Sequence, residues 1–391
     1  MPTRAEPEHR GIDVLGVGAV SAAGRGLETL WRATLAARPL AEPVRRYAPS
    51  GCRTRRAALV PDEIVEALRA TWPDEDLAVA LCLEAAREAL GGRALHPDAA
   101  VLVGTSLGGV AAWEPWHRAR LVGAAPPPPR CATHDDVAPQ VASRMGARGP
   151  ALTLSSACTS GAAALIVAGD MVRAGEVPEA LVLGVDVLGA FVHVGFDRLG
   201  ALAPDDLAPA PFAADRAGLW LGEGCAALLL GRGPGVARYL GGASASDGVH
   251  MTAPDRDGDG MRRAISAALA DARRAPSDIA WVSAHATATR YNDAMEAAAL
   301  RTIFGDAAPP VHALKPVTGH TLGASGLLEA ALATRALRER VRPPTASRAR
   351  DPELPWIHLD PRAEPMGAGL ALSINAAMAG HNTAIVLGAA A

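Results

Sequence analysis

Short runs of hydrophobic residues recur along the whole chain and predict β-strands. They are rich in Val, Ile, Leu and Ala and contain few polar positions. Such near-continuous hydrophobicity is typical of strands that are buried on both faces of a sheet. The predicted strands are residues 12–20, 99–106, 151–156, 180–186, 225–231, 279–285, 370–375 and 383–388.

Stretches rich in Ala and Leu alternate with these runs and predict helices. They cover residues 28–37, 61–70, 77–90, 161–174, 260–274, 293–303 and 326–340. Strands that alternate with helices predict a layered α/β fold. Two segments, 154–169 and 314–330, share the order of strand end, polar turn and small-residue helix, which indicates two related halves.

Loops rich in Pro and Gly separate several of these elements, at residues 124–136, 203–218 and 252–260. The proline run in the first loop fits either a linker or a surface excursion. The excursion is favoured because helix and strand patterns continue on both sides of it.

The composition argues against several classes of protein. Charged residues make up 20% of the chain and the formal net charge is −3, which is not typical of a nucleic-acid binder or a basic membrane-surface protein. No charge-free run of about 20 apolar residues is present, so no transmembrane helix is predicted. Residues 1–11 lack the apolar run of a secretory signal. Five cysteines without metal-binding spacing favour a reducing cytoplasm and no metal site.

Cys158 is the first candidate for chemistry. It lies in the polar turn SSACTS, between a predicted strand and a helix of small residues. The unpaired N–H groups and the dipole at a helix start lower the pKa of a thiol and favour the thiolate. A buried, inert cysteine is the alternative, and Cys225 in the apolar run CAALLLG is an example of it. Local sequence leaves both interpretations of Cys158 open.

His285 follows a predicted strand and precedes a polar loop. Thr287, Thr289, Asn292 and Asp293 lie in this loop and are side chains of the kind that fix a histidine tautomer. A purely structural histidine at a strand end is the alternative interpretation.

His320 lies in the glycine-rich turn KPVTGHTLGASG, five residues after Lys315. Gly319 and Gly323 indicate special backbone angles or a close approach at this turn. A further candidate is the segment 373–382, SINAAMAGHN, where a strand leads into a turn of small residues. Such a turn can present backbone N–H groups to an oxyanion.

Ser106 offers a competing prediction, because GTSLG at residues 104–108 has the form of a serine-hydrolase nucleophile elbow. The pentapeptide is common, and no HGGG-type oxyanion segment precedes it. The GVGAV segment at 16–20 lacks the third glycine of a dinucleotide fingerprint, so no nucleotide cofactor is predicted. The HDD segment at 134–136 is interpreted as a solvated loop beside the proline run rather than a metal site.

Taken together, these segments resemble the β-ketoacyl-acyl carrier protein synthases, the elongating condensing enzymes of fatty acid and polyketide synthesis. The resemblance covers nearly the whole chain, and the set of motifs in this order is specific. The motifs are VLGVGAVSAAGRG, VGTSLGG, SSACTSGAAAL, PFAADRAGLWLGEGCAALLLG, ASDGVHMTAPDRDGDGM, AHATATRYNDAMEA, KPVTGHTLGASGLLEA and SINAAMAGHNTAIVLG.

The resemblance implies a thiolase-like fold with two related halves in α-β-α-β-α layers, residues 1–235 and 236–391. It implies a cytoplasmic homodimer, or a heterodimer with a related subunit. The expected partners are an acyl carrier protein and malonyl and acyl thioesters, without nucleic acid, membrane, metal or other cofactor.

The resemblance also implies roles for individual residues. Cys158 matches the acyl-accepting nucleophile, His285 and His320 the two active-site histidines, and Lys315 the lysine of the family's motif. The amides of Cys158 and Met378 match the oxyanion hole. The residues expected to line the pocket are Ala376, Ala377, Met378, Thr287 and Thr289.

Two other activities stay open beside decarboxylative condensation. The first is a ketosynthase-like acyltransferase that loads Cys158 but releases no CO2. The second is a non-catalytic partner subunit, which the retained cysteine, lysine and two histidines argue against. The presence of two histidines, rather than a histidine and an asparagine, favours the elongating branch.

The sequence departs from the family pattern at several positions near the candidate site. The loop 375–380 lacks both phenylalanines that usually gate the acyl pocket, and alanines replace two glycines. Ala286 stands where glycine is usual, Arg290 where proline is common, and Leu314 where a small hydroxyl residue is typical. A wider gate with a stiffer hinge, suited to an unusual acyl chain, is favoured over neutral drift. The NDAMEA segment is similar to ketosynthases of polyene and aryl-polyene pathways.

Overall fold

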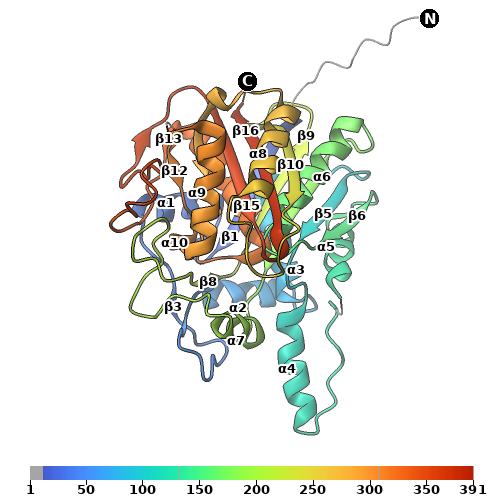
Figure 1. The fold of residues 1–391 in the computed structure, drawn as a ribbon. Helices are drawn as coiled ribbons and strands as arrows, with labels where there is room; N and C mark the ends of the chain where they lie inside the picture. The colour runs from blue at the N-terminus through green and yellow to red at the C-terminus, as the bar shows by residue number, and fades with distance from the viewer. Residues whose placement is uncertain (1–11, 132, 307, 391) are drawn as a thin grey trace, which may run out of the picture.

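The computed structural model describes residues 12–131, 133–306 and 308–390 (Figure 1). Residues 1–11, where no secretory signal is predicted, lie outside the described part.

The main sheet consists of two five-stranded halves. In order across the sheet, the first half is β6 (Ala151–Leu154), β5 (Ala100–Gly104), β7 (Ala180–Asp186), β9 (Gly224–Gly231) and β1 (Ile12–Ser21). The second half is β12 (Val311–His312), β11 (Ile279–Ser283), β15 (Leu370–Ala376), β16 (His381–Ala389) and β10 (Ala237–Ser246).

The two halves share one topology. When the strands of each half are numbered along the chain, both halves have the order third, second, fourth, fifth, first. Strands β1 and β10 pair antiparallel from Ile12 opposite Tyr239 to Val14 opposite Ala237, and this short ladder joins the halves. The repeat confirms the predicted fold of two related halves, while the boundary at residue 235 stays a prediction.

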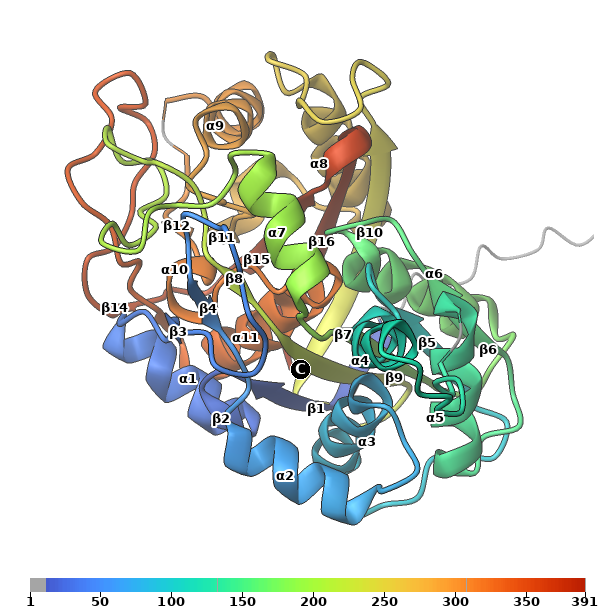
Figure 2. The same cartoon turned by 90° about the horizontal axis from the view of Figure 1, so that it is seen from below.

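Helices form three layers: one lies between the two halves of the main sheet, and one covers the outer face of each half (Figure 2). The central layer consists of α6 (Ser160–Ala174) and α11 (Ser325–Glu339), which pack against both halves. The first half is covered on its outer face by α3 (Leu77–Leu90) and α5 (Val137–Met145). The second half is covered by α8 (Asp259–Ala272) and α9 (Arg290–Phe304). These are the predicted α-β-α-β-α layers.

Small residues allow α6 and α11 to pack closely. A Cβ atom on Gly326 would lie 2.8 Å from the Cβ of Ala162, and one on Gly161 would lie 2.8 Å from the carbonyl oxygen of Gly323. Within the described residues, Ala157–Ala174 is long and apolar enough to cross a membrane by composition, with a mean hydropathy of 1.2. It is 61% buried inside the protein, so its place in the central layer accounts for its composition.

The hydrophobic pattern missed elements that lack a continuous apolar face. Strand β10 has the sequence ARYLGGASAS, which contains no continuous run of large apolar residues. A Cβ atom on its Gly241 would lie 2.6 Å from the backbone nitrogen of Ala272 in α8. The close approach of β10 to α8 therefore requires glycine at this position. The expectation that all strands are buried on both faces is wrong for β6, because it is an edge strand and Leu152 is 42% exposed.

Helix α4 (Val110–Leu121) was also missed, because it has no buried residue. It projects from the body, and the chain carrying the proline run returns beside it (Figure 1). Leu121 and Val122 at its end are 86% and 83% exposed. The proline run is therefore a surface excursion rather than a linker.

The remaining elements are short or peripheral. They are α1 (Leu27–Ala36), α2 (Asp62–Thr71), α7 (Ala190–Arg198), α10 (Lys315–Thr318), β2 (Gly24–Arg25), β3 (Glu42–Pro43), β4 (Arg56–Ala58), β8 (Leu221–Gly222), β13 (Val341–Arg342) and β14 (Glu364–Pro365).

Candidate active site

Cys158 lies in a tight turn, residues 155–160, between β6 and the start of α6. The preceding residue, Ala157, has φ +52°, a left-handed conformation that costs a non-glycine residue about 1–2 kcal/mol. Two hydroxyl groups donate to its carbonyl oxygen, Ser106 Oγ at 2.7 Å and Ser160 Oγ at 2.6 Å. These hydrogen bonds hold the strained turn in place.

Asp186, at the end of β7, links this turn to the His320 loop. Its buried carboxylate accepts hydrogen bonds from Thr105 Oγ1 at 2.6 Å and from the backbone N–H groups of Ser106, Leu107 and Gly323 at 3.0, 2.9 and 2.6 Å. Sequence reasoning missed Asp186, although an acidic residue at the end of a fully apolar strand was a signal. The GTSLG segment is thus a structural turn, and its serine hydroxyl supports the backbone before Cys158.

The Ser106→Ala substitution is expected to leave most of the activity. It removes one of two hydrogen bonds to the Ala157 carbonyl, worth about 0.5–1.5 kcal/mol, and Ser160 keeps the other. We expect a small decrease in unfolding temperature and less than about a tenfold loss of turnover. Thermal unfolding and turnover of the purified variant measure both. Complete loss of turnover in a folded variant, or labelling of Ser106 by a fluorophosphonate, would instead support the hydrolase interpretation.

His285 and His320 come from separate loops, after β11 and after α10, and their rings meet in one cavity. The ring centroids lie 5.2 Å apart with an interplanar angle of 87°. Burial lowers the pKa of both rings well below the usual range, and the positive charge of Lys315 lowers both further. Both imidazoles are therefore neutral at neutral pH. The Nδ1 atom of His320 lies 3.0 Å from Ser325 Oγ, which leaves its Nε2 atom for other partners.

The backbone of His285 is held by a residue that the sequence analysis missed. The carboxylate of Glu296, on α9, accepts hydrogen bonds from His285 N at 2.7 Å, Ala286 N at 2.6 Å and Asn292 Nδ2 at 2.7 Å. Burial, with the charge of Asp293 adding to it, raises the pKa of Glu296 to about 8.

The expectation that the polar loop residues fix the ring of His285 is wrong. The hydroxyls of Thr287 and Thr289 bond to each other at 3.0 Å, and Asn292 donates to Glu296. Among the residues that the structure describes, the buried Nδ1 atom of His285 has no hydrogen-bond partner. The position of the ring is set through its backbone, which leaves the ring nitrogens available to a ligand.

Replacing Ala286 with glycine is expected to stabilise the protein. Ala286 has φ +47°, where alanine costs about 1–2 kcal/mol and glycine does not. The added freedom of the unfolded chain offsets about 0.4–1 kcal/mol of that gain. We expect a net rise of about 0.5–1 kcal/mol in the free energy of unfolding, measured by denaturant titration. Ala298→Gly, inside α9, is the matched control and is expected to lose about 1 kcal/mol.

Lys315 forms a buried ion pair behind the two histidines. Its Nζ atom lies 2.6 Å from Glu329 Oε1, and the other oxygen of Glu329 accepts a hydrogen bond from Asn375 Nδ2 at 2.5 Å. All three side chains are buried. Lys315 is also the only lysine in a chain with 38 Lys and Arg residues. A compact ammonium group thus stands at this buried position, where the planar fork of an arginine would not be equivalent.

One cavity of about 550 Å³ brings the predicted residues together. Its lining includes Cys158, His285, His320, Thr287, Thr289, Ala376, Ala377 and Met378. Lys315 lies behind the lining. The loop that carries Met378 is anchored by Ala379, whose backbone N–H donates to the carbonyl oxygen of Met251 at 2.8 Å. Helix α7 adds Phe196 to the cavity wall.

The predicted low pKa of Cys158 is wrong for the protein without a substrate. The thiol is only 7% exposed, and burial raises its pKa to about 12, against the opposing effect of the Lys315 charge. The loss of hydration raises the pKa more than the Lys315 charge lowers it, because a thiolate at this buried position would have few hydrogen-bond donors. The resting group is a thiol, which must lose its proton during reaction.

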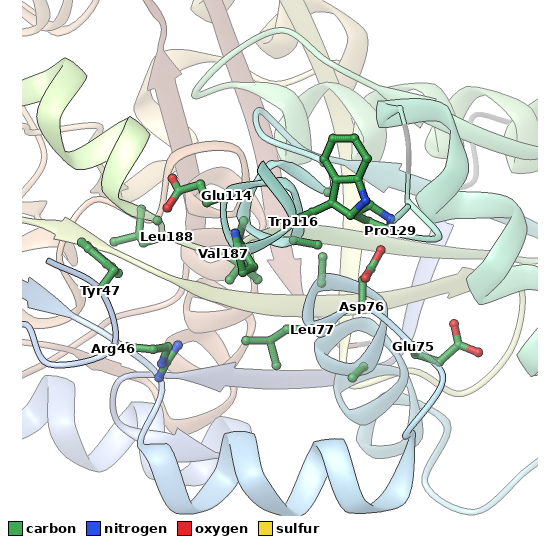
Figure 3. A pocket seen from close by; sticks show the side chains of 18 of the residues that line it. Arg46, Tyr47, Glu75, Asp76, Leu77, Glu114, Trp116, Pro129, Val187 and Leu188 are labelled. Carbon is green, nitrogen blue, oxygen red and sulfur yellow. The ribbon is translucent and has the colours of Figure 1, made fainter. Parts of the chain in front are cut away.

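A second cavity, of about 710 Å³, lies beneath α4 (Figure 3). Its lining includes Arg46, Tyr47, Glu114, Trp116 and Leu188 but no cysteine or histidine. Two of its charged groups have structural partners: Glu114 accepts hydrogen bonds from the first backbone N–H groups of α7, and Arg46 pairs with Glu223. The groups suited to covalent chemistry therefore lie in the first cavity.

Two related halves in five layers, with a cysteine at a helix start facing two histidines, define a condensing enzyme of the thiolase-like fold. The family model of the beta-ketoacyl synthase N-terminal domain matches residues 9–234, and that of the C-terminal domain matches residues 236–348. The chain belongs to the β-ketoacyl synthase family and is an enzyme of that class.

Individual relatives agree with this assignment. A polyketide beta-ketoacyl synthase of Streptomyces cyaneus is 31% identical over 97% of this chain and 98% of its own length. A 3-oxoacyl-[acyl-carrier-protein] synthase 2 of Mycobacterium tuberculosis is 37% identical over 62% of each chain. The solved structure of the ishigamide ketosynthase/chain length factor has a TM-score of 0.90 at 29% identity and covers 98% of this chain and 100% of its own.

Proposed function

We propose that this β-ketoacyl synthase transfers an acyl group to Cys158 and condenses it with malonyl-acyl carrier protein, yielding 3-oxoacyl-acyl carrier protein and CO2. The single observation that carries the proposal is that one cavity is lined by Cys158, His285 and His320 and backed by the Lys315–Glu329 pair. No metal or redox group is needed for these steps.

In the first step, the sulfur of Cys158 attacks the thioester carbonyl of the acyl donor. The thiol proton passes to the departing carrier thiol, so the step exchanges one thioester for another. A neutral imidazole can carry this proton, because the lowered pKa values leave both rings unprotonated. We assign the oxyanion hole to the backbone N–H groups of Cys158 and Met378.

In the second step, malonyl thioester loses CO2 and leaves an enolate. The Nε2–H groups of neutral His285 and His320 would donate to its thioester oxygen and stabilise the developing charge. The enolate carbon then attacks the acyl carbonyl, the carbon–carbon bond forms, and the Cys158 thiolate leaves and regains a proton. Burial, with the charge of Lys315 adding to it, keeps both rings neutral, and Lys315 is itself balanced by Glu329.

The acyl chain is proposed to be of the specialised polyketide or polyene type. Where bulky aromatic gate residues are usual in the family, Ala376, Ala377 and Met378 line this cavity. Ala379 adopts φ +68°, so the turn after Met378 is formed by an alanine in a conformation that favours glycine. An alanine restricts the motion of this loop more than glycine does, which fits a wider and stiffer entrance.

We propose that the enzyme works in the cytoplasm as a dimer, with itself or with a related chain length factor such as the one in the ishigamide structure. The edge strand β6 and the projecting helix α4, with Leu121 and Val122 exposed, offer apolar surface for this contact. Sedimentation of the chain alone distinguishes the two forms, since a homodimer has twice the monomer mass without any partner.

Intact-mass analysis tests the function in two stages. The protein is first incubated with an acyl-carrier thioester and then with malonyl carrier. We expect an acyl adduct on Cys158, followed by loss of the adduct, release of CO2 and formation of 3-oxoacyl carrier. No adduct would refute the proposal. An adduct that persists without release of CO2 would favour the non-decarboxylating acyltransferase.

A further inference from the structure

Arg290 stands at the rim of the reactive cavity, where the family pattern commonly has proline. It is exposed and lines the cavity together with its exposed neighbour Tyr291, whereas Cys158 in the same lining is buried. Thr287 and Thr289 lie in the same lining, between the histidine loop and this rim. The cavity therefore extends from a buried thiol to a surface arginine.

The other charged groups that line the cavity already have partners. Arg216 pairs with Asp351 at 2.5 Å, and Asp247 accepts a hydrogen bond from Asn382 at 2.7 Å. The two histidines are neutral. In the described ranges, no carboxylate lies within 4 Å of the Arg290 guanidinium.

The position of Arg290 is not explained by the stability of its helix. It is the first residue of α9, where the helix dipole disfavours a positive side chain. The nearest acidic residue in that first turn, Asp293, is fully buried and accepts a hydrogen bond from the backbone of Phe212. The charge of Arg290 helps to lower the pKa of Asp351 at longer range, but its guanidinium forms no close ion pair in the described ranges and adds positive charge to the cavity rim.

We propose that Arg290 binds the phosphodiester group of the phosphopantetheine arm on which a carrier protein presents its thioester. This inference rests on the proposed function, because the arm must place its sulfur end beside Cys158 and its phosphate end outside the protein. A guanidinium matches a phosphate with two parallel charge-assisted hydrogen bonds. Arg290 would be a positioning residue for the substrate and takes no part in bond making.

The test compares three acyl donors that carry the same acyl group: the carrier protein, free phosphopantetheine, and pantetheine, which lacks the phosphate. For Arg290→Ala, we expect KM to rise about tenfold to thirtyfold for the two phosphate-bearing donors, with kcat little changed. For the pantetheine thioester, KM is expected to stay within about twofold. Arg290→Lys should recover part of the loss, because it keeps the charge but not the fork.

Arg274→Ala is the matched control, since Arg274 is also exposed but does not line the cavity. An equal rise in KM for all three donors would overturn the proposal and indicate an effect on cavity shape. An unchanged KM for phosphopantetheine would also overturn it. Turnover of the pantetheine thioester by the wild-type enzyme reports the proposed function separately, so the two failures can be told apart.

Discussion

Replacing Cys158 with alanine is expected to abolish both the acyl adduct and condensation. The reaction proposed here passes through a thioester on this sulfur, and no other cysteine or histidine of the cavity can replace it as an acyl carrier that survives for mass analysis. We expect the rate of 3-oxoacyl product formation to fall by at least about 10⁴-fold. Cys158→Ser should be similarly inactive, because a buried hydroxyl is a far weaker nucleophile than a thiol.

The control for this prediction is Cys52→Ala. Cys52 is also buried and also has a raised pKa, but it lies outside the reactive cavity. Its loss should leave the adduct and the rate unchanged. The two variants should unfold at similar temperatures, since each loses one small buried group. An adduct that persists in Cys158→Ala would contradict the assignment, and peptide mapping would then locate the true acceptor.

The fold could be predicted from sequence where burial determines composition. Most strands of both halves are apolar because helices cover both faces, and the pattern located the strands of the two halves except β10 and the short β12. In β10, glycines and small polar residues allow the strand to approach α8, so no hydrophobic run marks it. Helix α4 was missed because none of its residues is buried, so its sequence carries no apolar stripe for the pattern to detect.

The residues proposed to react could be selected from sequence only as a set, through the family resemblance of their motifs, and the structure brings them to one cavity. The residues that hold these reactive residues in place could not be found from sequence. Asp186 and Gly323 are 137 positions apart, and Glu329 and Asn375 are 46 apart, so only the folded chain shows that they touch. The prediction of a low pKa for Cys158 was wrong for a related reason. Local sequence shows the helix start that favours a thiolate, but it does not show the burial that outweighs it.

The Lys315–Glu329 pair should have the largest effect on stability of any pair in the site. Lys315→Met leaves the Glu329 carboxylate buried without its cation, which costs about 3–5 kcal/mol in the free energy of unfolding. Burial already raises the pKa of Glu329, and loss of the lysine removes the main opposing effect, so its pKa rises further. A carboxyl whose pKa is higher in the folded state stabilises the fold at low pH. That contribution is lost as the pH rises toward the folded-state value, so the variant should be weakest at neutral and alkaline pH.

The double variant Lys315→Met/Glu329→Gln separates stability from catalysis. It removes both charges, so we expect it to recover most of the lost stability and to lose the pH dependence that the single variant shows. It should not recover activity, which we expect to be at least about 100-fold below wild type in both variants, because the ammonium group is absent from the site. Denaturant titrations at pH 5 and 8 and steady-state rates measure these outcomes.

The histidines provide a second readout of the same pair. Burial lowers their pKa values, and the Lys315 charge lowers them further. In Lys315→Met the positive charge is gone, so both pKa values should rise and the acid limb of the pH–rate profile should move to higher pH. The double variant should show a similar rise, because the Glu329 carboxyl of the single variant, whose own pKa has risen, is largely protonated at acid pH. If the acid limb is the same in all three proteins, Lys315 does not set the charge of the histidines, and the pair serves the fold alone.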